Sequence, residues 1–161
     1  MEEQVQKILR SFSFHLGLSM DVLQSLGEEQ LGLTVGKNMG TIGEQFRHIG
    51  RVITQYTEAI ENKRIDKTKE YPNVDIAKSK KELIAYLDGA YKRLESLLGS
   101  MNEEELINLV IDWSYWKDKP MGIVPHLAAL INHQSLHNGE LIVYLKAHEI
   151  SFPSSWKAWG L

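Results

Sequence analysis

The chain of 161 residues has no cysteine. Without thiols it can form neither disulfides nor thiolate–metal bonds, so a tight transition-metal site would have to be built from histidine and carboxylate side chains. Six histidines are present. Long apolar runs are also missing, since no stretch approaches the roughly 18 apolar residues of a membrane-spanning helix. Residues 1–4 are acidic, where a secretory signal begins with basic residues. We therefore expect a cytoplasmic protein with no membrane partner.

Basic runs are scarce too, since none is longer than Lys80-Lys81, and the formal net charge is -3. The chain thus lacks the extended positive surface that binds phosphate backbones, which argues against nucleic acid as a partner. Hydrophobic residues make up 43% and charged residues 24% of the sequence, as in ordinary globular proteins. At this length one core is expected, and residues 1–161 are predicted to form a single domain.

Apolar residues recur at three- and four-residue steps in four segments, which is the spacing that lines one face of an α-helix. The segments extend from Val5 to Leu26, from Ile42 to Ile60, from Leu83 to Leu98, and over approximately residues 122–148. Helices with one apolar face bury those faces together, so the sequence predicts an all-α four-helix bundle. The connections are long enough for one of them to cross the length of the bundle.

Local signals indicate where several elements begin and end. Thr41 and Glu44 have the spacing of a capping box at the start of the second helix, and Gly27 suits a C-terminal cap after the first. Between the third and fourth helices, residues 102–105 predict a short capped turn, and residues 109–115 alternate between apolar and mostly polar like an extended segment.

His133 and His137 lie four residues apart on the fourth predicted helix, so their imidazoles leave the same face one turn apart and can reach a common ion. This spacing alone is weak evidence. Leu130 and Leu141, however, place the two rings where the apolar stripe turns inward. A buried imidazole nitrogen without a partner costs about 1–3 kcal/mol, and a metal ion removes that cost at one nitrogen of each ring.

A third ligand has to come from another helix, and His48 at the edge of the second helix's apolar stripe is the best candidate. His126 precedes His133 by seven residues, about 10 Å along a helix, which is too far to share an ion at bond lengths of ~2.1 Å. For His126, His15 and His148 the favoured interpretation is a core hydrogen bond or a solvated surface ring.

Two glutamates lie within one helical turn of the predicted ligands. Glu44 precedes His48 and could be a fourth ligand or accept an imidazole N–H, although a capping role is favoured. Glu140 follows His137 by three residues and could orient a ligand or a bound water, or simply be exposed.

Two segments resemble those of a known family. They are Gly43-Glu44-Gln45-Phe46-Arg47-His48-Ile49 on the second predicted helix and His133-Gln134-Ser135-Leu136-His137-Asn138-Gly139-Glu140-Leu141 on the fourth. In order and separation they are similar to the DinB-like, or YfiT-like, metalloenzymes, and the likeness covers essentially the whole chain. The resemblance implies that His48, His133 and His137 bind a divalent ion, usually zinc or nickel, in a four-helix bundle that forms a homodimer. Glu140 stands where many members carry glutamine.

Three neutral imidazoles leave an ion its full charge and at least one open position, which is typical of catalytic sites. Such an ion can activate a water, bind a thiolate or polarise a carbonyl. We therefore expect a divalent-metal-dependent enzyme with a small-molecule substrate, either a hydrolase or an S-transferase that uses a low-molecular-weight thiol, as the resemblance also implies. The alternatives are a metal-binding or interaction protein without turnover, and a metal-free bundle whose histidines are satisfied by hydrogen bonds.

No general base is evident, and the candidates are Glu140, Tyr144 and Asp112. Five aromatic residues could line a pocket mouth or a dimer seam, with core packing favoured for most of them. These are Trp113, Tyr115, Trp116, Trp156 and Trp159.

Overall fold

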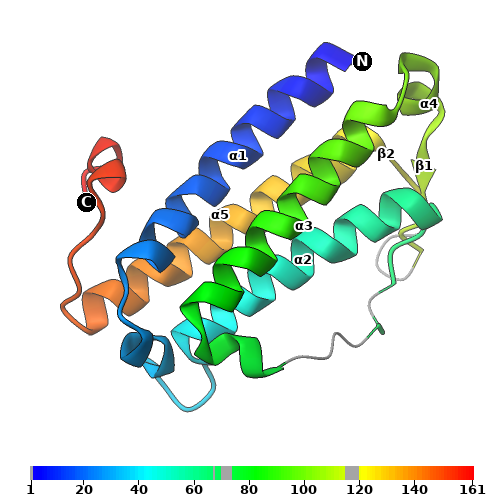
Figure 1. Ribbon diagram of the computed structural model, residues 1–161. Coiled ribbons are helices and arrows are strands. Elements are labelled where there is room, and N and C mark those ends of the chain that lie inside the picture. Colours follow the sequence, from blue (N-terminus) through cyan, green and yellow to red (C-terminus); the bar gives the residue numbers. More distant parts are fainter. Residues whose placement is uncertain (1, 67, 70–73, 115–119) are drawn as a thin grey trace.

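The computed structural model describes residues 2–66, 68–69, 74–114 and 120–161. Its body consists of four long helices that lie alongside one another (Figure 1). They are α1 (Glu2–Ser25), α2 (Ile42–Asn62), α3 (Lys80–Ser100) and α5 (Ile123–Ala147). The all-α four-helix bundle predicted from the apolar periodicity is confirmed. Within the described residues, no helix combines the length and the apolar character that crossing a membrane requires.

Shorter elements join and follow the long helices. They are η1 (Glu28–Gly32), η2 (Val74–Lys78), α4 (Glu103–Asn108), β1 (Val110–Ile111), β2 (Met121–Gly122) and η3 (Ser154–Trp159). The two short strands pair antiparallel, with Val110 opposite Gly122 and Ile111 opposite Met121. The strands hold together the two ends of the segment that connects α4 to α5.

α2 and α3 point in the same direction (Figure 1), so the chain that joins them has to return from one end of the bundle to the other. Ile65, just after α2, donates its N–H to the carbonyl of Asp112 beside β1. At the other end of the bundle, a Cβ on Gly43 would meet the carbonyl oxygen of Ala77 in η2 at 1.8 Å, so the close approach of η2 to α2 requires glycine. This connection is the one that crosses the bundle's length.

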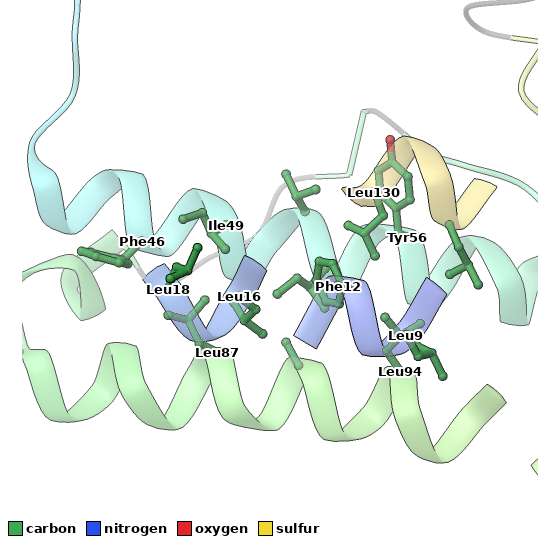
Figure 2. Close-up of a cluster of buried hydrophobic side chains, with 14 of the residues drawn as sticks. Leu9, Phe12, Leu16, Leu18, Phe46, Ile49, Tyr56, Leu87, Leu94 and Leu130 are labelled. Carbon is green, nitrogen blue, oxygen red and sulfur yellow. The ribbon is translucent and has the colours of Figure 1, made fainter. Parts of the chain in front are cut away.

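The helices pack in a ring in which α1 contacts α3 and α5, and α2 also contacts α3 and α5. Figure 2 shows Phe12 and Leu16 of α1 in one buried cluster with Ile49 of α2 and Leu87 of α3. All four side chains are buried, because each lies on the apolar stripe of its helix. Burial of these stripes leaves α2 and α5 side by side at the place where the predicted metal ligands lie.

Two predicted helix starts are confirmed and one predicted end is wrong. The Thr41–Glu44 capping box opens α2, and Asn102 with Glu105 forms another at α4. Gly27 was expected to be the C-terminal cap of α1, but with φ -75° and ψ 158° it is extended and is instead the N-cap of η1. The chain turns from α1 directly into this short helix, so no left-handed residue is needed between them.

The segment after α4 is extended and alternates as predicted. Leu109, Ile111 and Trp113 are buried, whereas Val110 between them is exposed. Tyr115, the last residue of the predicted alternation, lies outside the described residues.

Candidate metal centre

Three histidines from two helices meet where α2 packs against α5. The ring centroids of His48 and His133 are 5.6 Å apart, those of His48 and His137 are 4.7 Å apart, and those of His133 and His137 are 4.8 Å apart. One nitrogen of each ring lies within 4.8 Å of the corresponding nitrogens of the other two. The structure therefore brings together the three side chains that the sequence predicts as metal ligands.

The donor set fits a divalent ion. Bonds of about 2.1 Å at tetrahedral angles place ligand nitrogens about 3.4 Å apart. The candidate ligand nitrogens of the three rings all lie within 4.8 Å of one another, so they exceed this spacing by at most about 1.4 Å. Neutral imidazoles are also the protonation form in which histidine binds a metal.

His137 gives the strongest indication of a ligand. Its Nδ1 lies 2.6 Å from Oε2 of Glu140 and donates its hydrogen to that carboxylate. Its Nε2 is buried and has no hydrogen-bond partner among the described residues. Since a neutral imidazole with its proton on Nδ1 has its lone pair on Nε2, the carboxylate leaves Nε2 as the ligating atom. A metal ion would satisfy a nitrogen that is otherwise costly to bury.

The pKa of His48 is lowered to about 3. The largest cause is burial, followed by the neighbouring charges of His137, Arg51, His133 and Arg47, all of which disfavour a second positive charge at this place. At neutral pH this ring is therefore uncharged and its lone pair is not lost to a proton.

Arg51 contacts His48 in a way that opposes metal binding. A guanidinium nitrogen of Arg51 lies 2.8 Å from Nδ1 of His48. Arginine can only donate, so Nδ1 accepts and the proton of the neutral ring is on Nε2. If Nδ1 is the ligand, Arg51 competes with the ion for its lone pair; if Nε2 is the ligand, its proton has to move to a nitrogen that then faces a donor. In either case ligation by His48 requires the guanidinium to withdraw.

The residues that follow His133 and His137 fix α5 against α1 through a buried polar network. Gln134 donates to the hydroxyl of Ser19 at 2.7 Å, and that hydroxyl donates to Oδ1 of Asn138 at 2.5 Å. Asn138 in turn donates to the backbone carbonyl of His15 at 3.0 Å. Because the network sets the rotation of α5, it also sets the direction in which the two histidines leave the helix. The sequence analysis did not predict this network. Gln134 and Asn138, which are four residues apart like the two histidines that precede them, were a signal for it.

The three candidates for a general base have different surroundings. Glu140 is the one that hydrogen-bonds a histidine of the cluster. Tyr144 is buried, its hydroxyl donates to the carbonyl of Gly40, and burial raises its pKa. The carboxylate of Asp112 accepts the N–H of Ser114 at 2.8 Å, which lowers its pKa. Of the three, Glu140 is the one that the structure places against the histidine cluster.

Glu44 and His126 have the structural roles that were favoured for them. Glu44 belongs to the capping box of α2, where it accepts the N–H of Thr41 at 2.6 Å. His126 is fully buried, and both of its ring nitrogens have partners. The indole N–H of Trp113 donates to Nδ1 at 3.1 Å, and Nε2 lies 3.0 Å from the carbonyl of Tyr56, to which it donates. This ring is a core hydrogen-bonding group.

His15 and His148 are half-buried and have contacts of their own. Nε2 of His148 is 3.1 Å from the carbonyl of Thr34, and the ring of His15 packs edge-on against Trp159 at 5.9 Å. Neither belongs to the histidine cluster.

The aromatic residues divide between core and surface. Trp113 and Trp156 are buried, so core packing is confirmed for both, whereas Trp159 is 53% exposed. The predictions for Tyr115 and Trp116 lie outside the described residues.

Comparison with known proteins shows the family of this chain. The sequence profile of the DinB family matches residues 1–148. No curated protein matches the sequence significantly. A solved DinB-like protein from Bacillus cereus is 23% identical, with a TM-score of 0.70 over 93% of this chain and 96% of that one. Another from Bacillus subtilis is 15% identical, with a TM-score of 0.68 over 90% of this chain and 94% of that one. These two likenesses show the fold, and the profile match over nearly the whole length shows that the chain belongs to the DinB family.

Proposed function

We propose that this chain is a divalent-metal-dependent enzyme that acts on a small-molecule substrate, either as a hydrolase or as an S-transferase that uses a low-molecular-weight thiol. The observation that carries the proposal is the buried Nε2 of His137, which has no hydrogen-bond partner among the described residues and lies beside two further imidazoles. His48, His133 and His137 would hold the ion. Zinc and nickel are the proposed metals, because imidazole ligands suit both.

An ion held by three neutral imidazoles would keep at least one position open, and when bound it would lower the pKa of a water or thiol and polarise a carbonyl. Glu140 holds the proton on Nδ1 of His137 and so orients that ring. Its side chain is 41% exposed, which leaves it accessible to a nucleophile's proton. We therefore favour Glu140 as the proton acceptor.

The second candidate function is metal binding without turnover. It is favoured by the engagement of the other two candidate bases, since the hydroxyl of Tyr144 donates to Gly40 and the carboxylate of Asp112 accepts from Ser114. On this proposal Glu140 has only an orienting role.

Elemental analysis beside activity assays separates these candidates. Wild type purified in the presence of zinc or nickel is expected to hold about one ion per chain, as is the control variant His15→Ala, and His137→Ala is expected to lose it. The metal-loaded protein is then assayed with ester, amide and thiol-plus-electrophile panels before and after chelation. Turnover that chelation abolishes supports the enzyme, and a bound ion with silent panels favours the second candidate. Equal metal content in wild type and His137→Ala contradicts both.

A further inference from the structure

A cleft of about 290 Å³ opens beside His133. Among the described residues that line it, all but that ring are apolar or aromatic except Asn132, which is itself exposed. The other described residues of the lining are Tyr56, Trp113, Met121, Ala129 and Leu136. One wall of this apolar cleft is thus a predicted metal ligand, so anything bound in the cleft lies next to the metal centre.

The aromatic wall of the cleft is held in place from behind. The rings of Tyr56 and Trp113 pack edge to face with their centroids 5.6 Å apart, and both residues are buried. His126 joins them, because it accepts the indole N–H of Trp113 and donates to the carbonyl of Tyr56. The indole N–H is therefore already used, and Trp113 offers a ligand only its apolar surface. A preformed apolar wall of this kind is typical of small-molecule sites.

The size of the cleft limits what can occupy it. An apolar cavity of roughly 150 Å³ accommodates one benzene molecule, so this cleft suits one ring with a short substituent. A helix of about 10 Å diameter does not fit. An apolar group small enough to enter, attached to a polar group that reaches His133, matches both the volume and the lining.

We infer that the cleft takes an aryl or short alkyl group of the substrate, whose reacting polar group is held at the three histidines. The second half of this inference rests on the proposed metal-dependent function. The first half concerns the cleft alone and can be tested without metal.

Two hydroxamates test the inference on the zinc-loaded protein. Acetohydroxamate and benzohydroxamate have the same chelating head group and differ in a methyl against a phenyl group. Isothermal titration calorimetry is expected to show that wild type binds benzohydroxamate at least about tenfold more tightly than acetohydroxamate. Even one additional methylene group in an apolar pocket changes the binding preference by about 10-fold or more. Equal affinities of the two hydroxamates in wild type would overturn the inference.

A matched pair of variants ties the preference to the cleft. Ala129→Phe places a ring inside it, and the ratio of the two affinities is expected to fall to about one. Ala128→Phe makes the same change at the neighbouring residue, which is partly buried like Ala129 but does not line the cleft, and the ratio is expected to stay near the wild-type value. A ratio that Ala129→Phe leaves unchanged would overturn the assignment.

Metal-free protein distinguishes failure of the cleft from failure of the metal site. Toluene is titrated into it while the methyl signals of Met121 and Leu136 are followed by NMR. Saturable shifts in wild type that Ala129→Phe abolishes support the cleft even if no zinc binds, in which case only the proposed function fails. Absence of shifts overturns the inference. It is equally overturned if analytical ultracentrifugation shows a wild-type dimer that Ala129→Phe converts to a monomer, because a second copy then fills the cleft.

Discussion

Two buried histidines on α5, His126 and His137, differ in how their ring nitrogens are satisfied. Both nitrogens of His126 have partners in the core. At His137, Nδ1 is paired with Glu140, while Nε2 has no partner among the described residues. Since an unmet buried nitrogen costs about 1–3 kcal/mol, the first ring is stable as it stands and the second is suited to a ligand. Burial on the same helix therefore does not identify a metal site, whereas the state of the second nitrogen does.

The largest expected effect is on stability at His126. The variant His126→Ala leaves the indole N–H of Trp113 and the carbonyl of Tyr56 without their partner and opens a cavity, so the free energy of unfolding is expected to fall by about 2–4 kcal/mol. Urea unfolding of the metal-free protein measures this change. Metal content per folded chain should stay at the wild-type level, and a loss as complete as that of His137→Ala would erase the difference between the two rings.

The second prediction concerns the carboxylate that orients His137. Glu140→Ala removes the acceptor for Nδ1, and loss of such a partner typically lowers metal affinity by about 10–100-fold. Glu140→Gln keeps an acceptor oxygen and should fall between alanine and wild type. Competition with a chromophoric chelator gives the affinities. If alanine binds zinc as tightly as wild type does, the hydrogen bond has no orienting role.

The third prediction is a pH dependence that comes from His48. Its pKa is about 3 in the folded protein and about 6.5 when unfolded. Between these pH values the unfolded chain binds a proton at His48 that the folded chain does not. The contribution of His48 to the free energy of unfolding is therefore fully present above pH ~6.5 and is lost as the pH is lowered. With a discount for partial exposure, the loss is about 1–2 kcal/mol by pH ~4.5.

Urea unfolding of the metal-free protein at pH 7 and pH 4.5 tests this prediction. His48→Gln has no titrating ring at this position and should lose less stability than wild type over the same interval. Identical losses in the two proteins would mean that His48 titrates normally.

The smallest predicted effect is a gain. Arg51→Met removes the donor that faces His48 and also one positive charge, so metal affinity is expected to rise by up to about tenfold. Arg47→Met is the matched control, because Arg47 also disfavours charge on His48 but is not its hydrogen-bond partner. The rise should be larger for Arg51→Met in chelator competition. Unchanged or weaker binding in that variant would show that the guanidinium does not compete with the ion.

Much of the site was predictable, because its parts follow from helical periodicity. The four-residue spacing of His133 and His137 places both on one face of α5, whatever packs against it. The partner on α2 was less secure, since only the edge position of His48 and the family resemblance favoured it. Gly27 shows the limit of such local reasoning. Glycine suits a helix C-terminal cap, but here a second short helix, η1, begins directly after it, and Gly27 is extended as the N-cap of that helix.

The sequence by itself determined the four apolar stripes, hence the bundle, and a pair of imidazoles on one helical face, because these depend on residues within one or two turns of each other. Only the tertiary structure decided which histidine is satisfied, where Arg51 donates and that an apolar cleft adjoins His133. Each of these depends on the relative rotation and height of packed helices. Those are set by side chains far apart in the sequence, such as Ser19 and Asn138, and not by any local pattern.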